Sequence, residues 1–198
     1  MAKKRSKKEA IERYNSGVIF YNKRDYDKAV TDFRAALDAN PNNAQFKAAL
    51  ANTYSNRGVA KFDAKEYERA LNDFEKAHEL DRANEQYKEN LNIAKDSYKK
   101  QKIDKLCENA YTGYNKGKYM DSIRDLREAL KMEPEDKDIL QALAVAFNGR
   151  GVKSYEEGKF GYAIEDFEQA KKFWPAERQY AENLRSAKEA ARRKKKNG

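Results

Sequence analysis

The side chains that most often perform catalysis or bind metals are scarce in this sequence. His78 is its only histidine and Cys107 its only cysteine. A histidine-based metal centre needs several such ligands, and a cysteine nucleophile needs a histidine beside it. The nine glycines are scattered and form no phosphate-binding loop. We therefore expect no catalytic residue, no metal site, no cofactor and no enzymatic activity. Cys107 is predicted to be a half-buried structural thiol, and His78 a residue at the surface or at the edge of a groove.

Two arginines, Arg57 and Arg150, could bind an anion. Each precedes Gly-Val, and an aspartate follows each of them 16 residues later, at Asp73 and Asp166. One interpretation is a structural ion pair between the two helices of one repeat. The other is contact with a carboxylate of a partner. The sequence leaves both interpretations open.

The net charge of +9 is concentrated at the two ends of the chain. Residues 1–8 carry five basic side chains and no acid, and so do residues 191–198. Residues 9–190 are therefore close to neutral and do not form a general polyanion-binding surface. The basic ends have two interpretations: solvated, disordered tails, or salt-sensitive contacts with nucleic acid or an anionic membrane surface.

Composition also limits the class of protein. A single cysteine excludes an intramolecular disulfide, and no stretch approaches the ~18 apolar residues of a membrane span. The basic start of the chain is not followed by the apolar segment of a signal peptide. From these features we expect a cytoplasmic location.

One pattern of small and aromatic residues occurs four times with constant internal spacing, which is the signature of a repeat array. Each copy predicts two helices: apolar residues recur at spacings of three and four on both sides of a short turn. In the first copy the turn is near Arg24, and Asn40-Pro41 ends the second helix. The copies read Gly17, Tyr26, Ala29, Phe33, Ala36, Pro41; Gly58, Tyr67, Ala70, Phe74, Ala77; Ala110, Tyr119, Leu126, Ala129, Pro134; and Gly151, Phe160, Ala163, Phe167, Ala170, Pro175.

These residues resemble the tetratricopeptide repeat family, whose unit is a helix–turn–helix of 34 residues. The resemblance implies an all-α fold, a right-handed α-solenoid of such repeats, with the small residues where paired helices cross. Two positions depart from the pattern: Arg82 stands where proline is expected, and Ser122 where a small alanine is expected. On this frame the copies are residues 10–43, 51–84, 103–136 and 144–177.

The copies begin 41, 52 and 41 residues apart, so whole helical turns are inserted between them. We therefore predict long helices at about 43–63 and 137–156, and a longer one at about 84–116 that either continues or breaks near Lys99–Lys102. The two halves also repeat at an offset of 93 residues, which predicts a capping helix at about 177–193, with Tyr180, Leu184 and Ala187 facing inward. The remaining segments are a basic tail at 1–9, helix extensions at 44–50 and 137–143, a helical connection at 85–102, and the cap with its basic tail at 178–198.

The resemblance also implies a binding surface, because the first helices of such repeats line a concave groove. Aliphatic and aromatic side chains with a few amides suit an extended or helical peptide of another protein. The last aromatic of each first helix could equally pack inside the array. The basic tails are the alternative means of recruitment, and a homodimer through exposed edges stays open. The implied groove residues are Tyr14, Val18, Tyr21, Asn52, Ser55, Val59, Phe62, Tyr111, Tyr114, Asn148, Val152 and Tyr155.

Overall fold

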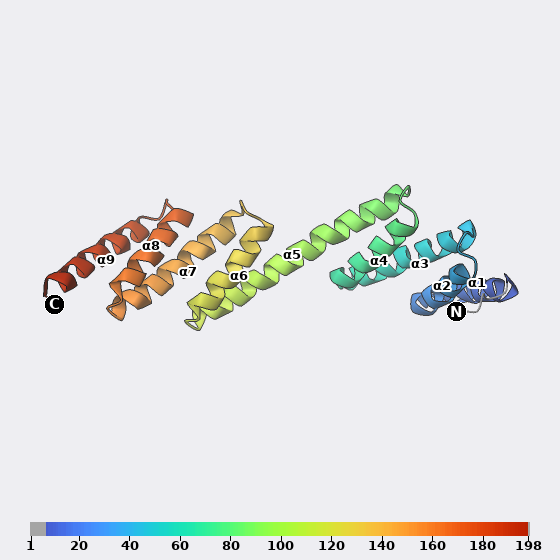
Figure 1. The fold of residues 1–198 in the computed structure, drawn as a ribbon, viewed down its shortest axis with the longest axis horizontal. Coiled ribbons are helices and arrows are strands. Elements are labelled where there is room, and N and C mark those ends of the chain that lie inside the picture. The colour runs from blue at the N-terminus through green and yellow to red at the C-terminus, as the bar shows by residue number, and fades with distance from the viewer. Residues whose placement is uncertain (1–6, 198) are drawn as a thin grey trace. The chain divides into compact units, whose positions relative to one another are not determined.

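In the computed structural model, which describes residues 7–197, every regular element is an α-helix (Figure 1). This confirms the predicted all-α fold. No helix in the described part is both long enough and apolar enough to cross a bilayer. The helices are α1 (Lys7–Asn22), α2 (Tyr26–Ala39), α3 (Ala44–Asp63), α4 (Tyr67–Leu80), α5 (Glu85–Asn115), α6 (Tyr119–Met132), α7 (Lys137–Glu156), α8 (Phe160–Phe173) and α9 (Arg178–Asn197).

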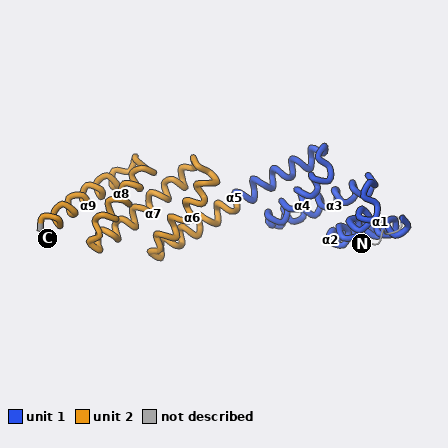
Figure 2. The backbone as a smooth tube through the Cα atoms, viewed as in Figure 1, with its two compact units in different colours: residues 1–100 blue, residues 101–198 orange. Residues whose placement is uncertain are grey.

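The chain divides into two compact units, residues 1–100 (unit 1) and residues 101–198 (unit 2) (Figure 2). Unit 1 contains α1 to α4 and the first part of α5, and unit 2 contains the rest of α5 and α6 to α9. The sequence left open whether α5 breaks near Lys99–Lys102. The structure shows an unbroken helix there, so the boundary between the units falls inside α5.

The helix ends differ from the sequence-based expectation mainly at the two termini. Helices α3, α5 and α7 begin and end within one residue of the predicted limits. Helix α1 begins at Lys7, so part of the predicted basic tail is helical, and residues 1–6 lie outside the described part. Helix α9 runs to Asn197 rather than ending near residue 193. Alanine, arginine and lysine favour helix, and cations in the last turn interact well with the helix dipole.

Close helix crossings explain the conserved spacing of the small residues within the repeats. A Cβ atom placed on Gly17 would lie 2.7 Å from the ring of Phe33, and the same clash arises between Gly58 and Phe74. Gly151 repeats the arrangement against Phe167, at 2.8 Å. Each phenylalanine ring therefore packs directly on the backbone of the facing helix. Any larger side chain at these glycines would push the two helices apart.

The turn inside each repeat needs one residue in the left-handed backbone region. The four positions are equivalent, at 24, 65, 117 and 158, with φ between 60° and 70°. Unit 2 uses Gly117 and Gly158, for which this conformation is free of strain. Unit 1 uses Arg24 and Lys65, whose Cβ atoms make it unfavourable. The turns of the two units therefore have the same backbone conformation, but this conformation is energetically unfavourable only in unit 1.

The last helix covers the end of unit 2 as the sequence predicts. Tyr180 and Ala187 of α9 are buried, and Leu184 is half-buried against Ala163 and Phe167 of α8. This packing gives the terminal repeat a partner for its apolar side. The predicted role of α9 as a capping helix is consistent with these contacts.

Candidate functional site

The twelve residues predicted to line a groove lie on the first helix of each repeat: α1, α3, residues 101–115 of α5, and α7. The most exposed is Tyr111, at 70%, and Val59, Val152 and Tyr155 are exposed at 37–41%. Asn52 is also exposed, whereas Ser55 is buried and so is not available to a partner. We call the exposed and half-buried members of this set in each unit the first-helix face of that unit. The half-buried members are Tyr14, Val18, Tyr21, Phe62, Tyr114 and Asn148.

Two cavities open on these faces, and the lining of the first recurs within the lining of the second. Cavity 1, about 380 Å³, lies in unit 1 between α1 and α3, and cavity 2, about 370 Å³, lies in unit 2 between α5 and α7. Every residue that lines cavity 1 has its counterpart 93 positions later in cavity 2. The pairs are Tyr14 and Cys107, Val18 and Tyr111, Tyr21 and Tyr114, Asn22 and Asn115, Phe33 and Leu126, Gln45 and Asp138, Ala48 and Gln141, Ala49 and Ala142, and Asn52 and Val145.

Cavity 1 is bordered by an aromatic cluster. The ring of Tyr14 stacks on Phe46, with ring centroids 5.0 Å apart, and lies 5.4 Å from the ring of Phe33. Gln45 Nε2 donates a hydrogen bond of 3.0 Å to the hydroxyl of Tyr14. The tyrosine, which lines the cavity, is therefore held at both its ring and its hydroxyl.

Cavity 2 lacks these rings, because Cys107 and Leu126 replace Tyr14 and Phe33. Its lining includes the buried side chains of Ala110, Ser122 and Ala146, none of which has a counterpart in the lining of cavity 1. Burial raises the pKa of the Cys107 thiol, and the carboxylates of Asp136 and Asp104 raise it further. Cys107 is thus half-buried, as predicted, and it sits in an acidic surrounding.

A third cavity of about 360 Å³ lies in unit 2 between α7 and α9. Val152 and Tyr155 of the first-helix face line it, together with the ring of Phe167 and the polar side chains of Asn183 and Ser186. The capping helix therefore extends the face of α7 by one more groove. Its mixed lining can take apolar and hydrogen-bonding groups alike.

The last aromatic of each first helix packs on the aromatic that begins the next helix. The ring centroids of Tyr21 and Tyr26 are 5.8 Å apart, and those of Phe62 and Tyr67 are 5.0 Å apart, both edge to face. The equivalent pairs of unit 2, Tyr114 with Tyr119 and Tyr155 with Phe160, are 5.4 and 5.3 Å apart. These aromatics therefore support each repeat from within. Tyr21, Tyr114 and Tyr155 still present one edge to a cavity.

Most amides expected to contact a partner are engaged by the next first helix, 35 residues later. Tyr87 of α5 donates its hydroxyl hydrogen to Asn52, and Asn90 Nδ2 lies 3.4 Å from the hydroxyl of Ser55. In unit 2, Asn183 Nδ2 donates a hydrogen bond of 2.8 Å to Asn148. Ser55 is buried because it packs in this contact between α3 and α5. The sequence did not reveal these bonds, although the recurring separation of 35 residues could have suggested them.

Arg57 and Arg150 both form the expected ion pair inside their repeats. Nε and Nη2 of Arg57 bind the two carboxylate oxygens of Asp73 at 2.9 and 2.6 Å, and those of Arg150 bind Asp166 at 2.8 and 2.6 Å. Arg57 additionally binds Asp27 of the preceding repeat at 2.7 Å. The structural interpretation is confirmed for both arginines. Contact with a partner's anion stays a prediction.

His78 is less accessible than the sequence suggested. It lies on α4 and is half-buried, and its Nδ1 is buried without a hydrogen-bond partner among the described residues. The imidazole therefore packs partly into unit 1, and its expected position at the edge of a groove stays a prediction. In the described part of the chain, no group of three His, Cys, Asp or Glu side chains is placed to hold a metal ion.

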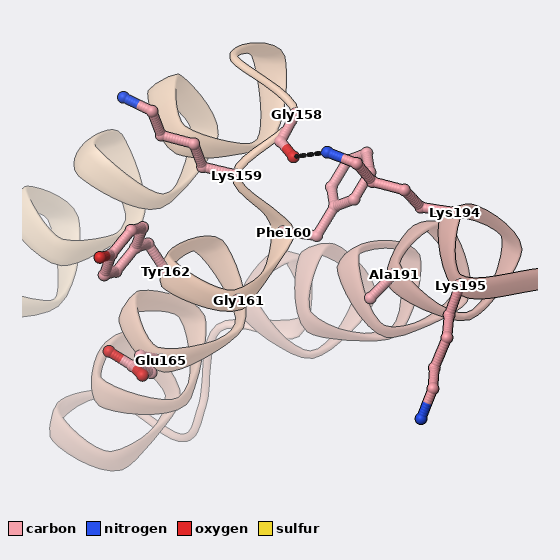
Figure 3. A pocket seen from close by; sticks show the side chains of 9 residues that line it. All are labelled: Gly158, Lys159, Phe160, Gly161, Tyr162, Glu165, Ala191, Lys194 and Lys195. Carbon is pink, nitrogen blue, oxygen red and sulfur yellow. Dashed lines mark hydrogen bonds between the residues drawn. The ribbon is translucent and has the colours of Figure 1, made fainter. Parts of the chain in front are cut away.

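A pocket of about 540 Å³ lies at the C-terminal end of unit 2, between the start of α8 and the end of α9 (Figure 3). Lys194 Nζ donates a hydrogen bond of 3.1 Å to the carbonyl oxygen of Gly158 and lies 5.7 Å from the centre of the Phe160 ring. Lys195 points away from both groups (Figure 3). The basic end of α9 is thus anchored through Lys194. This corrects the interpretation of the basic end as a disordered tail for residues 191–197, and residue 198 lies outside the described part.

Three models of the tetratricopeptide repeat match the sequence, over residues 9–43, 51–84 and 108–177. These matches cover well over half of the chain, and the helix pairs described above fall within them. The chain belongs to the tetratricopeptide repeat family. This repeat is typically a non-catalytic module for interactions between proteins, and the chain is a scaffold of that class.

Solved structures with likeness to the chain are tetratricopeptide proteins of low sequence identity. The TPR domain of P58(IPK) is 18% identical with a TM-score of 0.31; the match covers 93% of this chain, which spans 56% of the length of that domain. A TPR repeats protein from Bacteroides fragilis is 14% identical with a TM-score of 0.40, over 90% of this chain and 97% of that one. The TPR2AB domain of yeast Sti1, in complex with pHSP90, is 15% identical with a TM-score of 0.31, over 92% and 84% of the two chains. No curated protein matches the sequence.

Proposed function

We propose that this protein binds a peptide or helical segment of another protein along its first-helix faces. The observation that carries the proposal is the recurrence of one cavity, lined by equivalent residues, in both units. Cavities of a few hundred cubic ångströms with apolar linings and a few polar groups are the usual form of a binding site. Membership of a family of interaction modules supports the same conclusion.

Four exposed apolar side chains border cavities of unit 2. Tyr111 and Val145 line cavity 2, and Val152 and Tyr155 line the groove between α7 and α9. Exposed apolar groups that border a hollow mark interaction sites more often than scattered ones do. Apolar anchors of a partner would enter the cavities, since the amides on this face are largely engaged by neighbouring helices.

The test is affinity capture from a nuclease-treated cell lysate, with the full chain and a variant of its first-helix faces. In the variant, Val59, Tyr111 and Val152 are replaced by alanine. These side chains are exposed, so the fold should persist. We expect proteins captured by the full chain to be lost with this variant. A matched control replaces Ile19 and Tyr162, which are equally exposed but lie outside the faces, and should capture the same proteins.

A second candidate function is recruitment to nucleic acid or an anionic membrane through the basic end of α9. The observation that favours it is that four basic side chains there are exposed along a formed helix: Arg192, Arg193, Lys195 and Lys196. Replacing these four by glutamine retains Lys194 and its contacts with Gly158 and Phe160. Binding to a polyanion should then be lost, and in the unchanged chain it should fall steeply between ~50 and ~300 mM salt. Retention of protein partners by the same variant would support the first-helix faces as the working surface.

We also propose a cytoplasmic location, motivated by the lone cysteine and the high content of charged residues. Cell fractionation followed by immunoblotting measures it directly. Recovery of the protein in the culture medium would overturn it.

A further inference from the structure

Cavity 2 differs from cavity 1 at its inner end. In unit 1 the rings of Tyr14 and Phe33 line the cavity, and the buried Gly17, which is the counterpart of Ala110, is not part of its lining. In unit 2 the shorter side chains of Cys107 and Leu126 stand in their places, and the cavity reaches the buried Ala110. An empty space lined by apolar atoms loses van der Waals contacts that an inserted apolar group would restore. Unit 1 has an aromatic residue, Tyr14, at the position of Cys107, so the same helix plan accepts an aromatic ring at this point.

The rim of cavity 2 is acidic where that of cavity 1 is uncharged. Asp138 lines the mouth from the first turn of α7, and its counterpart in unit 1 is Gln45. Asp104 lies one turn before Cys107 on α5, close enough to raise the pKa of the thiol, and its counterpart is Ile11. Asp136, which also raises that pKa, corresponds to Asn43.

The basic residues nearest in sequence do not cancel this charge at the cavity. Lys105 and Lys137 follow Asp104 and Asp136 directly, so each is rotated by about 100° around its helix from that neighbour. Neither lysine lines cavity 2. Asp138 lines cavity 2, and Asp104 and Asp136 lie near Cys107 without lining it, so the mouth is negative at Asp138 and a cationic partner is favoured there.

We infer that cavity 2 binds an aromatic side chain of a partner protein whose neighbouring residues are lysine or arginine. The inference rests on the proposed function and deepens it by naming the chemistry of the bound segment. The aromatic ring enters between α5 and α7 in the place that Tyr14 holds in unit 1. The flanking cations lie near Asp104 and Asp138. Cavity 1, with its tyrosine in place and its uncharged rim, does not take the same ligand.

The probe for this inference is a fluorescent synthetic peptide with one phenylalanine flanked on both sides by lysines in a glycine–serine background. Fluorescence polarisation with the full chain should show binding that weakens as salt rises from ~50 to ~300 mM. A peptide with alanine in place of the phenylalanine should bind at least about tenfold more weakly, since an aromatic anchor in a closed pocket dominates such contacts. A peptide with glutamates in place of the lysines should not bind measurably.

Cys107 supplies a second readout, because it lines cavity 2 and is the only cysteine in the sequence. Saturating lysine–phenylalanine peptide should slow its alkylation by N-ethylmaleimide at least about fivefold, since a thiol under a bound ring is inaccessible. The ratio of rates with and without peptide is the measured quantity. Binding without protection would place the peptide elsewhere and overturn the inference.

Two variants and a control locate the site. Cys107→Tyr introduces the residue that fills the equivalent space in unit 1 and should abolish peptide binding. Replacement of Asp104 and Asp138 by asparagine leaves the cavity open and should weaken binding about fivefold at low salt, with little effect at high salt. This second variant keeps the test valid if the tyrosine disturbs folding. Glu182→Gln removes one exposed acid of unit 2 outside the cavity and should change nothing.

The outcomes separate this inference from the proposed function. No peptide binding, or equal binding of the alanine peptide, would overturn the inference. If the first-helix-face variant nevertheless loses its captured proteins, the proposed function stands with a different ligand chemistry. If that variant captures the same proteins as the full chain, the proposed function itself is wrong.

Discussion

Unit 1 and unit 2 share one 93-residue plan, and every residue that lines cavity 1 has a counterpart in the lining of cavity 2. Their chemistry differs: unit 1 presents a held tyrosine, a glutamine and an asparagine, whereas unit 2 presents a thiol, an aspartate and a valine. The helices and crossings that position these side chains are alike in both units. The two units therefore have the same arrangement of helices but different side chains around their cavities. Two related units can therefore offer two different binding sites.

The same comparison extends into the packing. Unit 1 pairs Gly17 with Phe33 at its first crossing, and unit 2 has Ala110 and Leu126 at the equivalent positions. Because Leu126 has no ring, the facing helix can carry the methyl group of Ala110 where unit 1 needs Gly17. The two pairs are thus alternative solutions to one crossing. The ion pair between arginine and aspartate also differs between the units. In unit 1, Lys61 lies beside Asp73 as a second cation, whereas unit 2 has Ser154 at the position equivalent to Lys61.

The largest effect is expected from breaking the ion pair of unit 2. Arg150→Met leaves Asp166, only 4% exposed, without its guanidinium, and should destabilise unit 2 by about 3 kcal/mol. Arg57→Met should cost about 1 kcal/mol less, because Lys61 remains 2.8 Å from Asp73. Urea unfolding measures both, with the fluorescence of Trp174, the only tryptophan, reporting on unit 2 and circular dichroism on the whole chain. An equal loss for the two variants would mean that Lys61 adds no more than the lost contact between Arg57 and Asp27 removes.

The next effect concerns the first crossing. Gly17→Ala places a methyl group 2.7 Å from the Phe33 ring and should destabilise unit 1 by about 2 kcal/mol. Adding Phe33→Leu copies the pair found in unit 2 and should recover at least about 1 kcal/mol of that loss. Thermal unfolding of the two single variants and the double variant gives the coupling. Additive losses would contradict the view that the two pairs are alternatives.

A smaller effect is expected in the turns. Arg24→Gly and Lys65→Gly give unit 1 the glycines of unit 2, and each should stabilise the chain by about 0.5–1 kcal/mol through relief of the left-handed backbone. The reverse change, Gly158→Lys, should destabilise unit 2 by a similar amount. Midpoints of urea unfolding compare the three variants. A loss of stability in Lys65→Gly would show that its side chain contributes more than its backbone costs.

The smallest expected effect tests the acidic rim through the thiol. Because burial and nearby carboxylates raise the pKa of Cys107, its alkylation at pH 7.5 should be slower than that of a free cysteine. Asp104→Asn removes one of these charges, lowers the pKa of the thiol and should increase the rate about twofold. The rate should rise with pH in both proteins, with the variant reaching half of its maximum at lower pH. Glu182→Gln serves as the control and should leave the profile unchanged.

The sequence was sufficient for the architecture because the fold depends on spacing. The 93-residue offset and the whole-turn insertions predicted α3, α5 and α7 to within one residue. The sites of close crossing followed from the glycines, since only a missing side chain allows that approach. The continuity of α5 could not be derived, because polar residues near Lys99–Lys102 permit both a helix and a break.

The candidate binding surface was less predictable, because it depends on which side chains form hydrogen bonds with neighbouring helices and so are not available to another protein. The buried position of Ser55 and the bonds of Asn52 and Asn148 require the geometry of two successive helices. Cavity 2 is equally invisible in the sequence, since its lining is assembled from side chains of three helices, α5, α6 and α7. Of the candidate residues, those that stay accessible were distinguished only by the structure.

The hydrogen bonds between successive first helices have a consequence for dynamics. Asn56 of α3 donates to the hydroxyl of Tyr21 on α1, whereas unit 2 has Gly149 at the equivalent position, with the rings of Tyr114 and Tyr119 against its backbone. The first two repeats are therefore joined by a polar link that the third and fourth repeats lack. Local opening of one helix in unit 1 must break this link as well as apolar contacts. Amide protons of α1 should accordingly lose protection together with those of α3, while those of residues 101–115 of α5 and those of α7 exchange as separate groups.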